Sequence, residues 1–194
     1  MELNEKTIGF ALTGSLCTYK KVIPEIKRLK NMGANIIPIM SEASFNTDTR
    51  FGKAMDFHKE IEEICENKII STIYDAEPIG PKKLLDILII APCTGNTISK
   101  IAHGIADSVV TLSVKSHLRN LQPVVIAIST NDGLGGNAEN IGHLLNRKNI
   151  YLVPFGQDDY KEKPNSLIAD MLLIPDTIKA ALSGKQFEPL LISH

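Results

Sequence analysis

Short apolar runs recur along the chain, and each is followed by a polar turn and then by a stretch with helical periodicity. Within these runs the apolar residues follow one another without alternating, which is typical of parallel strands buried on both faces of a sheet. The pattern predicts about six strands, at residues 7–12, 34–40, 69–73, 86–91, 123–129 and 150–154.

The segments between the runs carry apolar residues three or four positions apart, as one face of a helix requires. Val22, Ile26 and Leu29 have this spacing after the first run, and Gly33 is a suitable residue to end that helix. The same reasoning predicts helices around residues 57–64 and at 97–106, 137–146 and 165–182.

This alternation of strands and helices continues without an internal repeat or a linker, which predicts a single domain over residues 1–194. The expected fold class is α/β, a three-layer, doubly wound parallel sheet of the Rossmann-like or flavodoxin-like kind. Ligands of such folds bind outside the carboxyl ends of the strands. The residues directly after each run are therefore the first candidates for a site.

Small polar residues follow the first two runs. Gly14 and Ser15 come after the first run, and Ser41 comes after the second. Backbone N–H groups and hydroxyls at the start of a helix suit an anion, and the alternative for each position is a plain capped turn. A GxGxxG motif and an acidic residue ending the second run are both missing, which disfavours a nicotinamide dinucleotide.

The segment after the fourth run carries the most specific pattern, APCTGNTISKIAHGIAD over residues 91–107. It resembles the signature APATANTIAKIA-x-GIAD of the flavoprotein family that includes flavin-containing cysteine decarboxylases. The resemblance implies FMN, with its phosphate near Ser15 and Ser41 and its isoalloxazine near Thr94 and Asn96. The cofactor-binding residues expected on this basis are Gly14, Ser15, Ser41, Pro92, Thr94, Gly95, Asn96, Thr97 and Ser129.

Two departures separate the chain from those decarboxylases. They carry a catalytic His eight residues before the Asp that opens the fourth run, where this chain has Pro78, which cannot transfer a proton. They also carry Pro-Ala-Met-Asn after the fifth run, where this chain keeps only Asn131. Flavin-dependent decarboxylation is therefore an alternative and not the leading hypothesis.

Further segments resemble a narrower family, the B subunits of dipicolinate synthase. They are TRFG at 49–52, AEPIGP at 76–81, LRN at 118–120, STNDGLG at 129–135, VPFGQD at 153–158 and KPNSL at 163–167. The resemblance implies an FMN-binding component in the oxidation of a dihydrodipicolinate-type precursor to dipicolinate during sporulation. It also implies a dehydrogenase-like partner, the A subunit of dipicolinate synthase, together with a trimer-based homo-oligomer and the cytoplasm of the mother cell.

A small dicarboxylate substrate requires placed cations. Arg50 and Arg119 are candidates because a planar guanidinium binds a carboxylate through two hydrogen bonds, and Lys163 is a weaker third. Asn131 is suited to hydrogen-bond the flavin or the substrate. Asn131, Arg119 and Arg50 are the predicted catalytic residues, against the alternatives of solvated surface cations and an Asx-Gly turn.

Composition and charge exclude other classes of partner. Lys plus Arg number 21 and Asp plus Glu number 22, and this balance argues against nucleic acid. The longest apolar run, residues 87–91, is too short to span a membrane. Three scattered cysteines indicate reduced thiols in a cytoplasmic protein, with Cys17 and Cys93 as packing residues.

Two histidines and the metal chemistry complete the sequence-based expectations. His103 and His117 are candidate acid–base groups, with a subunit contact as the favoured interpretation of His103. Metal-ligand spacing is missing, so no metal site is predicted.

A second hypothesis, from another functional class, is a non-catalytic assembly or binding subunit for the dehydrogenase-like partner.

Overall fold

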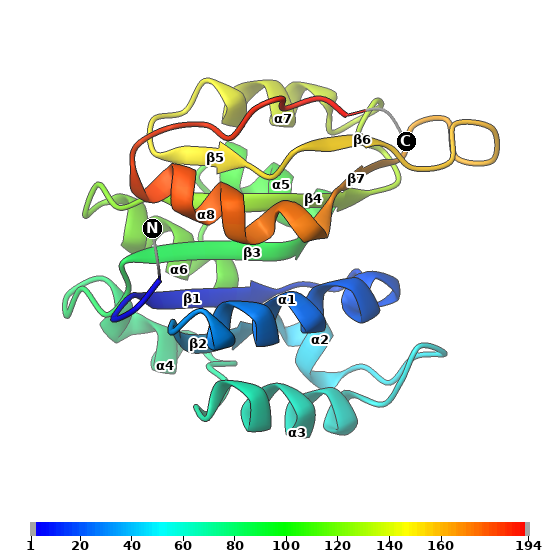
Figure 1. The fold of residues 1–194 in the computed structure, drawn as a ribbon. Coiled ribbons are helices and arrows are strands. Elements are labelled where there is room, and N and C mark those ends of the chain that lie inside the picture. The colour runs from blue at the N-terminus through cyan, green and yellow to red at the C-terminus, as the bar shows by residue number, and fades with distance from the viewer. Residues whose placement is uncertain (1–2, 193–194) are drawn as a thin grey trace.

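The computed structural model describes residues 3–192 and has a central, mostly parallel sheet between two layers of helices (Figure 1). The sheet order is β2-β1-β3-β4-β7-β6, and β5 also pairs with β4. The strands are β1 (Thr7–Leu12), β2 (Asn35–Met40), β3 (Ile87–Cys93), β4 (Val124–Thr130), β5 (Ile150–Leu152), β6 (Phe155–Gln157) and β7 (Leu167–Ala169).

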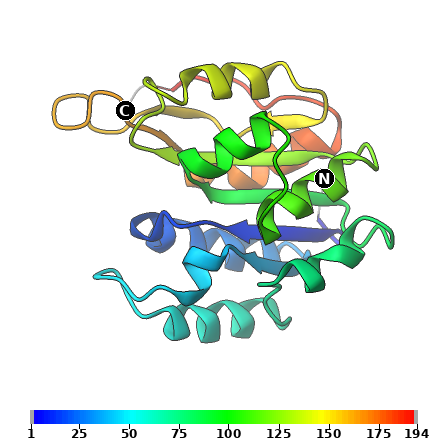
Figure 2. The same cartoon turned by 180° about the vertical axis from the view of Figure 1, so that it is seen from behind.

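Helices cover both faces of the sheet, which confirms the predicted three-layer α/β fold. The helices are α1 (Tyr19–Asn31), α2 (Glu42–Asn46), α3 (Ala54–Cys65), α4 (Ile73–Ala76), α5 (Gly95–Ala102), α6 (Val109–Leu118), α7 (Ala138–Leu145) and α8 (Ile174–Leu182). Figure 1 shows α1 and α8 in front of the sheet, and Figure 2 shows α5, α6 and α7 on the opposite face. Across residues 3–192, none of these helices is both long and apolar enough to cross a membrane.

The continuous apolar runs form the centre of the core. Every residue of β3 is buried, and so are all residues of β1 after Thr7. Ile8 and Phe10 on β1 and Ile89 on β3 have no exposed surface. Burial on both faces explains why these strands lack the alternation of a half-exposed strand.

The predicted strand at residues 69–73 is wrong. Ile70 forms only an isolated bridge with Ile39, and the chain then turns into α4. The reason is local, because the Thr72 hydroxyl accepts a hydrogen bond from the Asp75 backbone N–H at 3.1 Å and caps that helix.

Three other elements also differ from the prediction. The predicted helix at 165–182 begins with β7, which pairs antiparallel with β4 and β6 and makes the sheet mixed. The strand predicted at residues 86–91 continues through Pro92 to Cys93 as β3, with a shift of register after Ile90. Helix α6 was not predicted, although Ser108 and Thr111 form a capping box at its start.

The strand order reverses beside β1. Strand β1 pairs with β2 on one side and β3 on the other, both in parallel register. This is the topological switch point at which doubly wound sheets bind ligands. The loops after β1, β3, β4 and β6 reach the same edge of the sheet, so the fold places the candidate residues together.

His117, on α6, is a buried group whose ionisation is unfavourable. It is 2% exposed, and its Nε2 lies 3.1 Å from the Pro123 carbonyl oxygen. Burial lowers the pKa of His117 to about 4, although the hydrogen bond to Pro123 acts in the opposite direction. The side chain therefore stays neutral at pH 7 and is a packing residue of α6.

Stability should fall as the pH falls from about 6.5 towards 4, because the unfolded chain binds a proton at His117 in that range and the folded chain does not. The loss attributable to His117 between about pH 7.5 and pH 5 is about 2 kcal/mol in the free energy of unfolding. Urea unfolding at both pH values should show a smaller loss for His117→Gln. The exposed His143→Gln variant should behave as wild type, and equal losses in all three proteins would contradict this account.

Candidate functional site

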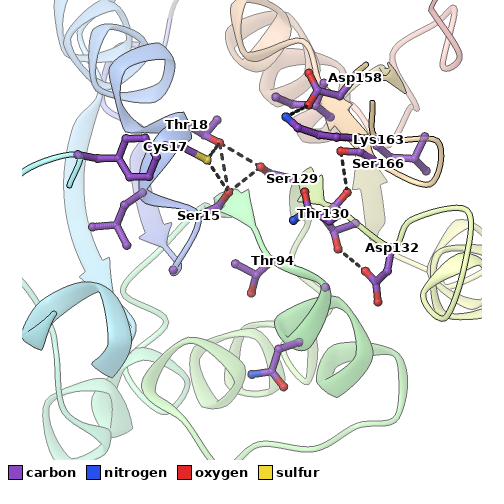
Figure 3. Close-up of a pocket in the computed structure, with 18 of the residues that line it drawn as sticks. Ser15, Cys17, Thr18, Thr94, Ser129, Thr130, Asp132, Asp158, Lys163 and Ser166 are labelled. Atoms are coloured by element: carbon purple, nitrogen blue, oxygen red, sulfur yellow. Dashed lines mark hydrogen bonds and ion pairs between the residues drawn. The ribbon is translucent and has the colours of Figure 1, made fainter. Parts of the chain in front are cut away.

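A pocket of about 500 Å³ opens at the carboxyl edge of β1, β3 and β4 (Figure 3). Four loops form its walls, namely residues 14–18 after β1, 94–96 after β3, 129–132 at the end of β4, and residues of 158–168 between β6 and β7. Thr49 and Phe51 add a rim from the segment after α2. The volume is in the range of small-molecule and cofactor sites.

Three hydroxyl groups meet at one end of the pocket. The Ser15 Oγ lies 2.8 Å from the Ser129 Oγ and 3.2 Å from the Thr18 Oγ1, and Thr18 Oγ1 lies 3.0 Å from Ser129 Oγ. Thr18 and Ser129 are buried, whereas Ser15 is half-buried and faces the pocket. Figure 3 shows this hydroxyl cluster of Ser15, Thr18 and Ser129 between the loops after β1 and β4.

A helical start lies beside the hydroxyl cluster. The 3-10 turn Leu16–Thr18 follows Ser15 and runs directly into α1. The first N–H groups of such a segment have no intrahelical acceptor, and the positive end of its dipole faces the pocket. Hydroxyls and backbone donors together make this end of the pocket an anion-binding environment.

Thr13 ties the two strands that flank the switch point. Its buried hydroxyl donates to the Pro92 carbonyl oxygen at 2.7 Å and accepts from the Thr94 backbone N–H at 3.0 Å. The hydroxyl is thus fully satisfied while it fixes the loop after β1 against the loop after β3. This contact sets the distance between two walls of the pocket.

A network of hydrogen bonds around the Asp132 carboxylate lies at the opposite wall. Asp132 accepts hydrogen bonds from the Thr130 hydroxyl and from the Asn137 amide, whose Nδ2 lies 3.0 Å and 2.8 Å from the two carboxylate oxygens. The Asn140 amide in turn donates to Asn137 Oδ1 at 3.0 Å. The network holds the Asp132 side chain in one position at the end of β4.

The hydrogen-bond network around Asp132 leaves no space for a side chain at Gly95. A Cβ at position 95 would lie 2.5 Å from Thr130 Oγ1, 2.6 Å from Asn137 Nδ2 and 2.8 Å from Asp132 Oδ1. A side chain there would therefore displace the whole network. The start of α5 approaches β4 closely only because residue 95 is glycine.

Gly95→Ala should lower the free energy of unfolding by about 1–3 kcal/mol, because the added methyl group overpacks a closely packed site. Gly142→Ala on α7 is the matched control, since a Cβ there meets nothing within 4 Å. That control should leave stability unchanged or raise it by up to about 1 kcal/mol. Urea unfolding measures both, and equal effects would refute the packing argument.

The connection between β6 and β7 forms the outer wall. Lys163 Nζ lies 3.0 Å from Asp158 Oδ2, and this contact raises the pKa of Lys163. The Gln157 amide donates to the Pro164 carbonyl at 2.8 Å, and Ser166 Oγ donates to the Thr130 carbonyl at 3.3 Å. Among the described residues that line the pocket, Lys163 is the single Lys or Arg.

Most of the predicted cofactor-binding residues are brought together. Those that line the pocket are Gly14, Ser15, Thr94, Gly95, Asn96 and Ser129, and the predicted catalytic residue Asn131 joins them. Pro92 and Thr97 lie directly behind this lining. Pro92 accepts the hydrogen bond from Thr13, and the Thr97 backbone N–H donates to the Thr94 hydroxyl at 3.4 Å.

Besides Pro92 and Thr97, three further predicted residues lie outside the pocket lining. Ser41 caps α2, where its Oγ accepts from the Ser44 backbone N–H at 3.3 Å. Arg50 lies between the rim residues Thr49 and Phe51, and its guanidinium carbon is 4.9 Å from the centre of the Phe51 ring. Arg119, at the end of α6, lines a different cavity.

The predicted site residues do not include Thr13, Thr18, Thr130 and Asn137, although the first three stand in the polar segments that follow the predicted strands. The first two flank Gly14 and Ser15 closely, so their position was a usable signal, whereas Asn137 was assigned only to the start of a helix. Cys93 is buried, as a packing residue should be, and burial raises the pKa of its thiol. Cys17 is exposed and lines the pocket, so the packing prediction is wrong for that residue.

The described part of the chain holds no group of three or more His, Cys, Asp or Glu residues arranged to bind a metal ion. His103 is exposed, with Nδ1 2.9 Å from the Ser99 carbonyl oxygen and its ring edge near His143. Neither His103 nor the buried His117 lines the pocket. The polar groups that line the pocket are therefore hydroxyls, amides, the Cys17 thiol, Asp132, Asp158 and Lys163.

Comparison with known proteins identifies the class. The model of the Flavoprotein family matches residues 1–180. The chain therefore belongs to the flavoprotein family, as the motif at residues 91–107 predicted.

Within that family the chain is similar from end to end to one kind of protein. The dipicolinate synthase B subunit of Bacillus subtilis (strain 168) is 47% identical over 192 residues, which cover 99% of this chain and 96% of that protein. The crystal structure of the corresponding B subunit from Bacillus halodurans C has a TM-score of 0.92 and 48% identity, and covers 100% of this chain and 99% of that one. The predicted resemblance to this group is confirmed.

A more distant neighbour shares the fold. The FMN-dependent cysteine decarboxylase SpaF is 22% identical with a TM-score of 0.67, and the match covers 93% of this chain and 97% of that one. The flavodoxin-like arrangement is therefore common to decarboxylases and to this chain. At this identity the likeness concerns architecture alone.

Proposed function

We propose that the chain is the FMN-binding component of a dipicolinate synthase, which takes part in oxidising a dihydrodipicolinate-type precursor to dipicolinate during sporulation. It acts with a dehydrogenase-like partner, the A subunit of that enzyme. The end-to-end similarity to dipicolinate synthase B subunits supports the reaction and the partner. The hydroxyl cluster at the switch point is the observation that carries the cofactor assignment.

The hydroxyl cluster fits the phosphate of FMN. Ser15, Thr18 and Ser129 offer three hydroxyls within 3.2 Å of one another, beside the N–H groups at the start of α1. Gly14 precedes Ser15 in the same loop and also lines the pocket. Phosphate held by backbone and hydroxyl donors at a helix start needs no matching cation, which agrees with the near-neutral charge of the chain.

The middle of the pocket fits a flat heterocycle. Thr94, Asn96 and Asn131 bring hydroxyl and amide groups to its walls, and these groups pair with carbonyl and ring-nitrogen edges. Asp132 is already bonded to Thr130 and Asn137, and Gly95 packs directly against these side chains. When bound there, FMN supplies a two-electron acceptor, and the protein contributes binding, orientation and electrostatics.

Carboxylates of the substrate would bind on the open side of the pocket. Lys163 carries a positive charge at this rim, with a raised pKa that keeps it protonated. Arg50 lies next to the rim residues Thr49 and Phe51 and can extend towards the same space. A homo-oligomer would add surface from a neighbouring chain at this side.

A non-catalytic assembly or binding subunit is the second candidate function. The observation that favours it is Pro78, which lies on the 3-10 turn Glu77–Ile79 where the decarboxylases have a proton-transferring His. The same residue weighs against a decarboxylase. A decarboxylase would release carbon dioxide from a cysteinyl substrate, whereas an assembly component would be colourless and yet required by the dehydrogenase-like partner.

FMN titration tests the cofactor assignment. The chain should bind FMN with quenching of flavin fluorescence, and Ser129→Ala should weaken that binding by about 10–100-fold, since a hydrogen bond to a charged group is lost. Ser183→Ala, an exposed serine at the end of α8, is the matched control and should bind FMN as wild type does. Wild-type affinity in Ser129→Ala would remove the hydroxyl cluster from the site.

Reconstitution tests the reaction. Dipicolinate formation, followed by its ultraviolet absorbance, should require this chain, FMN and the dehydrogenase-like partner together. Activity of the mixture that is indifferent to FMN, with a chain that takes up no flavin, would favour the assembly function. Activity of this chain alone would contradict the need for the partner.

A further inference from the structure

A second cavity, of about 360 Å³, lies at the other end of α5. It is bounded by the end of α5, the connection to α6, one face of α6 and a residue after α7; α5 and α6 are the green helices in the centre of Figure 2. Its lining consists of Ile101, Gly104, Ile105, Thr111, Val114, Lys115, Leu118, Arg119 and Arg147. It shares no lining residue with the pocket of the hydroxyl cluster.

Three cations face this second cavity. Lys115 and Arg119 are one turn apart on α6, and Arg147 comes from the segment between α7 and β5. None of the described lining residues is acidic, and none of the three cations forms an ion pair within residues 3–192. Since the chain as a whole has a net charge of −1, this cluster is local and not part of a general positive excess.

One of the two arginines is hydrogen-bonded, and the other packs against a neighbouring loop. Arg147 Nη1 donates to the Ile101 carbonyl oxygen at the end of α5 at 2.7 Å, which leaves its other N–H groups available. The Arg119 guanidinium lies against Gly80, where a Cβ would come within 3.0 Å of Nη2. Gly80 is itself anchored, because its carbonyl accepts from the Asn120 amide at 2.8 Å.

The floor of the cavity is apolar. Ile101 and Val114 are each 3% exposed, and Leu118 and Ile105 extend the apolar surface towards the rim. Guanidinium groups beside such a floor match carboxylates attached to a compact, flat apolar body. A strongly hydrated inorganic anion would leave the apolar floor unused.

We propose that this second cavity is a binding site for a small organic dianion, with two carboxylates on an aromatic or similarly flat body. Arg119 and Arg147 hold the carboxylates, Lys115 adds charge, and Ile101, Val114 and Leu118 contact the body. Helix α5, with eight residues and about 12 Å of helix rise, separates this site from the wall that Thr94, Gly95 and Asn96 form at the first pocket. The site is thus distinct from the pocket of the hydroxyl cluster, and the choice of a dicarboxylate as its ligand rests on the proposed function.

Calorimetric titration of the full chain with pyridine-2,6-dicarboxylate as the probe tests the proposal. Wild type should bind, and Arg119→Gln and Arg147→Gln should each weaken binding by at least about tenfold. Lys59→Gln, an exposed lysine on α3, removes the same charge elsewhere and should bind as wild type does. FMN affinity should be unchanged in both arginine variants, so that failure of this site is distinguishable from failure of the flavin assignment.

Ile105→Trp guards against a loss of folding in the arginine variants. Ile105 is 46% exposed at the rim, so the larger side chain should block the cavity without disturbing the core, and binding should again be lost. Benzoate and inorganic phosphate serve as competitors. Each should bind at least about tenfold more weakly than the probe does. Undiminished binding in the arginine variants, no binding in wild type, or equal competition by phosphate would each overturn the proposal.

Discussion

The hydroxyl of Thr13 joins the two strands on which the site depends. It donates to Pro92 and accepts from Thr94, at the place where the strand order reverses between β1 and β3. The loops after β1 and β3, two walls of the pocket, are held at a set distance by this contact, and both strands are buried in the close-packed core. The rigid sheet therefore presents short polar loops at fixed separations, which is what cofactor binding needs.

Positively charged side chains are distributed unevenly between the two cavities. The flavin pocket relies on hydroxyls and a helix start, with Lys163 already paired to Asp158, whereas unpaired cations gather around the second cavity. The two proposed sites thus differ in their donors. Hydroxyls and backbone N–H groups near β1 suit a phosphate, whereas the guanidinium groups of Arg119 and Arg147 suit carboxylates.

The sequence predicted the parts of the structure that burial determines. Residues of β1, β3 and β4 are apolar without alternation because both faces are covered, whereas residues 69–73 have a similar composition and only Ile70 pairs. Helix α6 is buried on most sides and lacks a clear polar face, so its pattern is weak. The location of Arg119 depends on that helix, so the spacing alone could not show where in the fold this predicted carboxylate-binding residue lies.

The most direct test of the central claim is a crystal structure of the chain grown with FMN. The account predicts that the phosphate lies within hydrogen-bonding distance of the Ser15, Thr18 and Ser129 hydroxyls, with the ring system beside Thr94, Asn96 and Asn131. A phosphate bound elsewhere, at the Ser41 cap or between Arg119 and Arg147, would contradict it.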